Sequence, residues 1–274
     1  PHDNVRMLNL IKNSDVPTVA MCMGDMGTPT RILAAKFGAP FTYATFHHER
    51  ALAPGQLSFK QMTEMYRYEE ITENTEIYGV IADPIGHSMS PLIHNAGFSE
   101  SNLDKVYLPF RVPREELVQF LKDCPSIGVR GLSVTIPHKE SVLAHCTKVD
   151  RAVQGIGAAN TLVFQDGQIL GYNTDYRAAM DSLSEVMKLP ANDKPLSGST
   201  ALLLGAGGVA KAIAYGLIRR GAKVFVAARN TARANAFAEN LGCSVVEWDN
   251  RHTINAAILV NCTPIGMHPN VDET

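Results

Sequence analysis

Hydrophobic positions along the chain fall into short apolar runs and into longer segments whose apolar residues recur every three or four positions. The short runs predict strands, and the three-to-four spacing predicts helices. Residues 201–204 are one apolar run, after which Val209, Ile213 and Leu217 share a helical face until Gly221. Because the two patterns alternate along most of the chain, the sequence predicts an α/β fold.

Changes in the pattern predict three domains. Residues 1–72 alternate helix and strand but would not enclose a core alone, since parallel strands need cover on both faces. Residues 76–187 contain an Asp166-Gly167 hairpin turn and predict a mixed sheet. Residues 188–274 predict a doubly wound domain. We expect strands at 17–23, 41–46, 77–82, 107–112, 131–136, 160–164, 168–172, 201–204, 223–228, 244–247 and 256–260, and helices at 28–37, 57–71, 115–121 and 233–241, with a further helix from 92 capped by Ser90.

Composition narrows the class of protein. The 274 residues are 45% hydrophobic, and a formal net charge of −2 argues against a large basic nucleic-acid surface. No apolar run approaches the roughly 18 residues of a membrane-spanning helix, and no signal peptide is visible. The cysteines are scattered without a CxxC pair or a zinc spacing. We therefore expect reduced thiols, no metal site, and a cytoplasmic location, or a plastid location if the parent is a plant protein.

Glycines follow the 201–204 run in the order Gly205-x-Gly207-x-x-Ala210, the alanine form of the dinucleotide-binding fingerprint. Gly205 permits a tight turn, Gly207 lets the backbone approach a pyrophosphate, and Ala210 lets the helix pack close to the strand. The phosphates would lie at the helix N-terminus, where unpaired N–H groups favour anions. This stretch therefore predicts a dinucleotide site.

Residues that follow two of the later expected strands complete the predicted dinucleotide site. Ala228-Arg229-Asn230 lacks the acid that holds the ribose 2′-hydroxyl of NAD. Arg229, with Arg233, can pair with a 2′-phosphate, so the sequence favours NADP; the alternative for Arg229 is a solvated loop charge. Thr263 and Met267 follow the last expected strand and either contact the nicotinamide or pack within the loop.

Polar side chains gather at the expected strand ends, where α/β sheets place ligand sites. Ser88 and Ser90 can donate hydroxyl protons to a carboxylate. Lys139 and Asp175 suit the reduction of a ketone, which needs a proton on oxygen as hydride reaches carbon. The alternative is a structural role for each residue, as a helix cap, a solvated charge or a local hydrogen-bonding group. The set is Ser88, Ser90, Thr135, Lys139, Asn160 and Asp175.

Six ordered motifs make residues 76–270 resemble shikimate dehydrogenase. One departure is Ser133, where many members carry Asn, because Ser keeps a hydrogen-bonding group but reaches less far. The motifs are Gly86-His87-Ser88-x-Ser90-Pro91, Ser133-Val134-Thr135-Ile136-Pro137-His138-Lys139, Gly157-Ala158-x-Asn160-Thr161, Gly171-x-Asn173-Thr174-Asp175, Gly205-Ala206-Gly207-Gly208 and Asn261-x-Thr263-Pro264-x-Gly266-Met267.

The resemblance implies NADP-dependent reduction of 3-dehydroshikimate to shikimate, with Lys139 and Asp175 as the catalytic pair. Two alternatives stay open: a quinate/shikimate dehydrogenase that uses NAD, and a non-catalytic ligand-binding module derived from the same pathway. The implied substrate-binding residues are Ser88, Ser90, Thr135 and Asn160, together with Asp175. The implied cofactor-binding residues are Gly205, Ala206, Gly207, Gly208, Val209, Arg229, Asn230, Thr231, Arg233, Thr263 and Met267.

Residues 1–72 resemble the last part of type I 3-dehydroquinate dehydratase, a (β/α)₈ barrel with a Schiff-base lysine. The shared residues are Met23-Gly24, Thr30-Arg31 and Ala53-Pro54-Gly55-Gln56. The resemblance implies substrate-binding ancestry for Arg31 and Gln56, although Leu52 stands where the family usually has Ser. The lysine-bearing strand would precede Pro1, so we expect Arg31 and Gln56 to be relic or scaffold residues and this chain to lack dehydratase activity.

The combination resembles a fused dehydratase–dehydrogenase protein. Its expected partners are a small-molecule substrate and the rest of the parent chain, with no nucleic acid and no membrane. The dehydrogenase family continues past Met267 with covering helices and a glutamine that contacts shikimate, whereas this chain ends at Thr274. We therefore expect the 274-residue chain alone to be poorly soluble or weakly active, and a longer chain to restore both properties.

Overall fold

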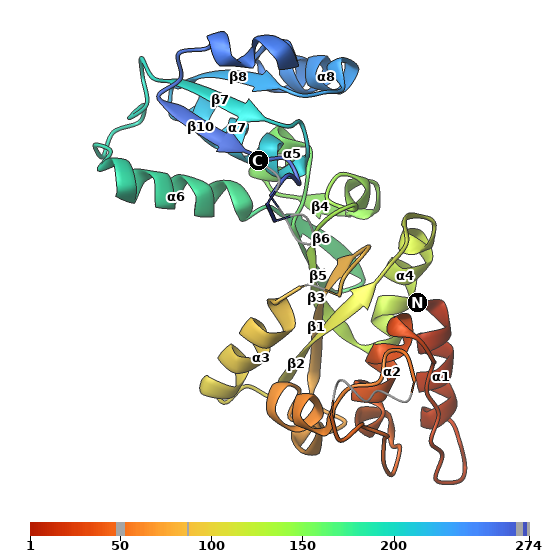
Figure 1. Ribbon diagram of the computed structural model, residues 1–274. Helices are drawn as coiled ribbons and strands as arrows, with labels where there is room; N and C mark the ends of the chain where they lie inside the picture. Colours follow the sequence, from red (N-terminus) through yellow and green to blue (C-terminus); the bar gives the residue numbers. More distant parts are fainter. Residues whose placement is uncertain (48–52, 87, 267–270, 273–274) are drawn as a thin grey trace. The chain divides into compact units, whose positions relative to one another are not determined.

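The computed structural model describes residues 1–47, 53–86, 88–266 and 271–272. The chain forms two compact units, of which the first holds residues 1–148 with 161–171 and the second holds 149–160 with 172–274. Both units combine helices with a sheet, which confirms the α/β class (Figure 1). The three domain spans expected from the sequence stay a prediction.

The first unit is built on a mixed sheet in the order β2-β1-β3-β5-β6-β4. β1, β2 and β3 run parallel, whereas β5 pairs antiparallel with β3. The elements are α1 (His2–Lys12), η1 (Asp25–Gly27), α2 (Thr28–Leu33), η2 (Ala35–Phe37), η4 (Gln61–Met65), η5 (Tyr68–Glu70), β1 (Glu76–Ala82), α3 (Ser90–Glu100), β2 (Lys105–Arg111), η6 (Arg114–Glu116), α4 (Leu117–Asp123), η7 (Cys124–Ile127), β3 (Val129–Val134), η8 (Ser141–His145), β4 (Lys148–Val149), β5 (Thr161–Gln165) and β6 (Gln168–Tyr172).

Alternation of side chains along β2 explains the two layers that cover this sheet. Figure 1 shows α3 on one side of β1–β3, and α1, α2 and α4 on the other. Successive strand residues point to opposite faces. Phe110 therefore meets Phe120 of α4, with ring centroids 5.2 Å apart, while Tyr107 stacks on His94 of α3 at 4.2 Å.

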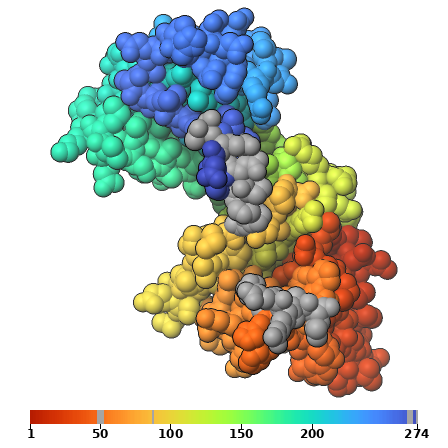
Figure 2. Space-filling model, viewed as in Figure 1, coloured from red at the N-terminus to blue at the C-terminus, as the bar shows by residue number. Residues whose placement is uncertain are grey.

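Residues 1–72 pack onto this sheet as part of the first unit. α1 contacts α4 and η7, and Nδ1 of His2 lies 2.7 Å from a carboxylate oxygen of Asp123. Leu8 of α1 is fully buried. In Figure 2 the atoms of this segment, in red and orange, lie directly against the yellow atoms of the residues that follow. Apolar residues of this segment, which could not enclose a core alone, are thus buried against the rest of the first unit.

Two strands expected in this segment are wrong. The runs 17–23 and 41–46 are extended but form no named strand, and the described residues pair there through one isolated bridge between Thr45 and Ser58. A strand exists through hydrogen bonds to a neighbouring strand, which these runs otherwise lack among the described residues. The helix expected at 57–71 is divided into the π-helix η4 and the 3₁₀ helix η5.

The second unit holds a four-stranded parallel sheet in the order β10-β7-β8-β9. This is the strand order of the dinucleotide-binding fold, in which ligands bind where the order reverses, at the carboxyl ends of β7 and β10. The doubly wound arrangement is confirmed. The elements are α5 (Arg151–Ile156), α6 (Asp175–Met187), β7 (Thr200–Leu204), α7 (Gly208–Arg219), β8 (Lys223–Ala227), α8 (Thr231–Leu241), β9 (Ser244–Val245), η9 (Trp248–Thr253) and β10 (Ile258–Asn261).

Close helix packing places α5 and α6 in the second unit. A Cβ atom added to Gly216 of α7 would come within 2.6 Å of Met180 in α6. One added to Gly155 of α5 would come within 2.3 Å of Tyr215 in α7. These glycines let the helices approach, and the segments 149–160 and 172–187 therefore belong to the same packed body as β7.

Candidate active site

Three of the expected substrate-binding residues and the expected catalytic lysine lie in the first unit, in the segments that follow the carboxyl ends of β1 and β3. The Thr135 amide donates to the Ile81 carbonyl at 3.1 Å, and the Asp83 amide donates to the Ile136 carbonyl at 3.2 Å. These bonds hold the two segments side by side. The residues concerned are Ser88, Ser90, Thr135 and Lys139, and each is half-buried.

Ser90 does not cap α3 as the sequence led us to expect. The helix begins at Ser90 itself, Met89 holds the N-cap position, and no side chain caps that end. The Ser90 amide donates to Ser88 Oγ at 3.3 Å. The two serines are thus linked directly to each other at the start of the helix.

Tyr107 is a residue of this region that the sequence analysis treated only as part of a strand. Its hydroxyl donates to Ser133 Oγ at 2.6 Å. The two-residue period of β2 was the available signal, because it places Tyr107 on the sheet face opposite Phe110. Tyr107 therefore belongs with the hydroxyl-bearing residues at this end of the sheet.

His138 anchors the segment that carries Lys139. The imidazole is fully buried, its Nε2 lies 2.7 Å from the Val112 carbonyl oxygen, and its Nδ1 has no hydrogen-bond partner among the described residues. Burial lowers the pKa of His138, Arg114 lowers it further, and the hydrogen bond to Val112 and the charge of Asp83 oppose the shift. A neutral His138 that donates through Nε2 satisfies this geometry.

The other expected substrate residues lie in the second unit, where Asn160 holds the start of α6. Its Nδ2 donates to Asp175 Oδ1 at 2.7 Å and to Thr174 Oγ1 at 2.9 Å, and its Oδ1 accepts from the Thr174 amide at 3.0 Å. The Asp175 amide donates to Asn173 Oδ1 at 3.0 Å. Asp175 is the first residue of α6, where the helix dipole favours a carboxylate. The structure thus presents this carboxylate in a fixed position.

The Gly205–Gly208 turn has the geometry that a pyrophosphate needs. Gly205 adopts a φ of +104°, and a Cβ atom there would lie 3.0 Å from the Cys262 carbonyl oxygen. Gly207 is extended, and no atom of the described residues lies within 4 Å of the position its Cβ would take. α7 begins at Gly208, so its unpaired N–H groups open onto this space. These residues fit a bound dinucleotide phosphate.

Two further segments border the carboxyl ends of this sheet. Arg229 is exposed just after β8, and Asn230 caps α8 by accepting the Arg233 amide at 2.9 Å. After β10, the Thr263 hydroxyl donates to Asn261 Oδ1 at 2.7 Å. Burial raises the pKa of Cys262 to about 11, so its thiol is neutral near pH 7 beside Gly205. Met267 lies outside the described residues.

Arg31 of the dehydratase-like segment is buried, and its side chain donates hydrogen bonds only to weak acceptors among the described residues. The side chain is 2% exposed, its guanidinium donates to the sulfur atoms of Met21 and Met23, and Nε has no partner among the described residues. Burial lowers its pKa. No described hydrogen bond joins Arg31 to Gln56, so their shared role stays a prediction.

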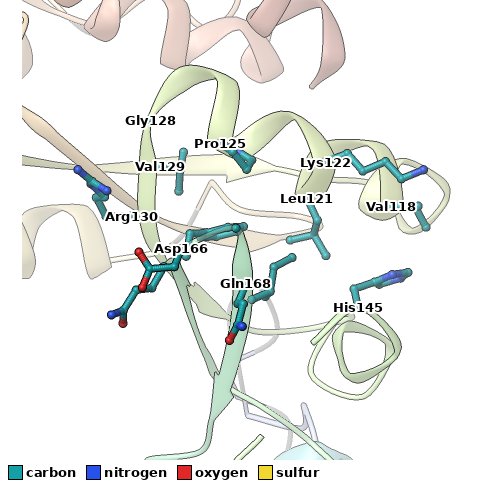
Figure 3. Close-up of a pocket in the computed structure, with 14 residues that line it drawn as sticks. Val118, Leu121, Lys122, Pro125, Gly128, Val129, Arg130, His145, Asp166 and Gln168 are labelled. Carbon is teal, nitrogen blue, oxygen red and sulfur yellow. The ribbon is translucent and has the colours of Figure 1, made fainter. Parts of the chain in front are cut away.

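A cavity of about 460 Å³ opens elsewhere in the first unit, between α4 and the β5–β6 hairpin (Figure 3). Leu121 approaches it from α4 and Gln168 from β6. None of the site residues expected from the sequence lines it. Among the described residues, no group of three or more His, Cys, Asp or Glu side chains could hold a metal ion.

Comparison with known proteins supports both of the family resemblances seen in the sequence. A family model of the shikimate dehydrogenase substrate-binding domain matches residues 80–162, and one of type I 3-dehydroquinase matches residues 1–73. A shikimate dehydrogenase (NADP⁺) of Caldanaerobacter subterraneus is 39% identical over 75% of this chain and 74% of that protein. The chain belongs to the shikimate dehydrogenase family. A model of coenzyme F420-dependent NADP oxidoreductases matches residues 200–274.

The dehydratase-like segment has a counterpart in a fused relative. The chloroplastic bifunctional 3-dehydroquinate dehydratase/shikimate dehydrogenase of Arabidopsis thaliana is 38% identical over 99% of this chain. The chain spans about half of that relative, since the match covers 47% of its length. A shikimate dehydrogenase from Thermus thermophilus, solved with NADP(H) and shikimate, has a TM-score of 0.63 at 32% identity and covers 73% of this chain and 72% of that one. None of the helices in the described ranges is long and apolar enough to cross a membrane.

Proposed function

We propose that this chain catalyses the NADP-dependent reduction of 3-dehydroshikimate to shikimate. The observation that carries the proposal is the fixed carboxylate of Asp175, which Asn160 holds at 2.7 Å. A family member solved with shikimate and NADP(H) supports the choice of ligands. The proposed partners are this small-molecule substrate and the remainder of a fused parent protein, and the proposed compartment is the cytoplasm or, in a plant, the plastid.

The proposed chemistry divides between binding and proton transfer. Ser88 and Ser90 bind the substrate carboxylate, because adjacent hydroxyl donors suit an anion. The Lys139 ammonium stabilises and protonates the oxygen that develops negative charge. Asp175 accepts a hydrogen bond from a substrate hydroxyl. Thr135 and Asn160 complete the proposed substrate contacts.

The cofactor residues are proposed from the shape of the second unit. When bound, NADPH supplies the hydride that the carbonyl carbon receives. Its pyrophosphate would meet the backbone of the turn before α7, and its 2′-phosphate would meet Arg229, which stands where an acid would favour NAD. The full proposed set is Gly205, Ala206, Gly207, Gly208, Val209, Arg229, Asn230, Thr231, Arg233, Thr263 and Met267.

A turnover assay tests the function directly. The purified protein is given shikimate or quinate with NADP⁺ or NAD⁺, and nicotinamide reduction is followed by absorbance. We expect the highest kcat/KM for shikimate with NADP⁺. Preference for quinate or for NAD⁺ would identify a quinate/shikimate dehydrogenase instead. Saturable shikimate binding without turnover would identify a ligand-binding module and refute the proposal.

A further inference from the structure

Two hydroxyl groups from separate strands meet near the proposed substrate residues of the first unit. The Tyr107 hydroxyl, from β2, donates to Ser133 Oγ of β3 at 2.6 Å. Ser133 lies two residues before Thr135, which is a proposed substrate residue. The Tyr107 side chain is 3% exposed. One buried phenol therefore holds Ser133, the position at which this chain departs from many relatives.

The phenol is held rigidly by α3. Asn95 brackets the Tyr107 backbone, since its Oδ1 accepts from the Tyr107 amide at 2.8 Å and its Nδ2 donates to the Tyr107 carbonyl at 2.9 Å. The His94 ring stacks on the tyrosine ring with an interplanar angle of 13°. The helix that begins with Ser90 thus also fixes the position of Tyr107.

The direction of the hydrogen bond from Tyr107 to Ser133 has a chemical consequence. A hydroxyl that accepts a hydrogen bond keeps its own proton for another acceptor, and a chain of hydroxyls polarises each member. Burial raises the pKa of Tyr107, so the phenol stays a donor across the physiological range. Ser133 therefore offers its proton away from Tyr107, and it does so from a fixed place although its side chain is short.

We propose that Tyr107 is a positioning residue that holds the Ser133 hydroxyl in place for the carboxylate of a cyclic hydroxy acid. The proposal rests on the function proposed above. Tyr107 acts on substrate binding through Ser133 and takes no part in proton transfer.

Tyr107→Phe tests the proposal, because it removes the hydroxyl and keeps the ring that stacks on His94. Loss of one neutral hydrogen bond of this kind corresponds to a rise in KM for shikimate of roughly three- to tenfold. We expect kcat within about twofold of the wild type and an unchanged KM for NADP⁺, because the carboxylate end lies away from the reacting carbon. Tyr78→Phe is the matched control, since Tyr78 lies on the same sheet face but its hydroxyl donates to Glu76 at 3.1 Å.

A double-mutant cycle with Ser133→Ala separates positioning from a structural role. If Tyr107 acts through Ser133, Tyr107→Phe raises KM less in the Ser133→Ala background than in the wild type. Ser133→Ala alone should raise KM by a similar factor, which keeps the test valid if Tyr107→Phe fails to fold. An unchanged KM in Tyr107→Phe, an equal rise in both backgrounds, or an equal rise in Tyr78→Phe would overturn the inference. Absence of shikimate turnover in the wild type would refute the proposed function and this inference with it.

Discussion

Substitution of two glycines in the turn before α7 should separate cofactor binding from folding. At Gly205 the backbone has a φ of +104°, and a new Cβ atom would lie 3.0 Å from the Cys262 carbonyl oxygen. At Gly207 the backbone is extended and the position of a new Cβ atom is open. Gly205→Ala should therefore destabilise the fold, whereas Gly207→Ala should block the approach of the pyrophosphate.

The magnitudes follow from this geometry. A residue other than glycine at a positive φ costs about 1–3 kcal/mol, and the close contact adds to that cost. At ~2–4 °C per kcal/mol, we expect Gly205→Ala to lower Tm by about 2–12 °C. Gly207→Ala changes only an N-cap residue and should cost less than about 1 kcal/mol. Its methyl group should raise KM for NADP⁺ at least about tenfold, which corresponds to ~1.4 kcal/mol.

Differential scanning calorimetry and steady-state kinetics on the same preparations distinguish the two effects. Gly242→Ala is a control for backbone strain alone, because Gly242 has a φ of +72° with no described atom near its Cβ position. It should lower Tm less than Gly205→Ala and leave KM for NADP⁺ unchanged. Normal NADP⁺ affinity in Gly207→Ala would show that this turn does not hold the pyrophosphate.

Three other predictions concern single side chains. Lys139→Ala should lower kcat by roughly 10²–10⁴ with little change in NADP⁺ affinity, and a near-normal kcat in single-turnover assays would remove Lys139 from proton transfer. Arg229→Asp should shift the ratio of kcat/KM values from NADP⁺ toward NAD⁺ by at least about tenfold, and an unchanged ratio would show that Arg229 does not bind the 2′-phosphate. Because the pKa of His138 is lowered in the fold, the unfolded chain binds this proton more readily; stability from the neutral ring is present above a pH of about 6.5 and is lost as the pH falls toward the folded pKa. Thermal midpoints measured from pH 8 to 5 should therefore fall less steeply in His138→Asn than in the wild type, and parallel slopes would contradict this assignment.

The sequence predicted the dinucleotide half of the fold well because local signals and packing agree there. The run at 201–204, the glycines after it and the stop at Gly242 all correspond to the observed β7, turn and α8 end. The Asp166-Gly167 hairpin is likewise confirmed, with both residues at positive φ. Each of these features depends on a few adjacent residues, which a single sequence can show.

The errors arose where distant groups decide the local structure. The runs at 17–23 and 41–46 have strand-like composition, yet strand formation needs a neighbouring strand that no local pattern reveals. Ser90 has the residue type of a helix cap, but the helix begins at Ser90 itself and Met89 holds the N-cap position. The contact between β2 and α3 that fixes Tyr107 is a tertiary feature, so the role of Tyr107 could not be read from its position in the chain.

The packing of α1 against α4 and η7 couples the stability of the dehydratase-like segment to that of the sheet it covers. A ligand that binds only the folded state adds about 2.7 kcal/mol to the unfolding free energy at a hundred times its Kd. Because residues 1–72 share one packed unit with β1–β3, a ligand of the proposed substrate site would also protect the dehydratase-like segment from unfolding and proteolysis. The supply of that ligand would thereby influence how long both parts of this chain survive.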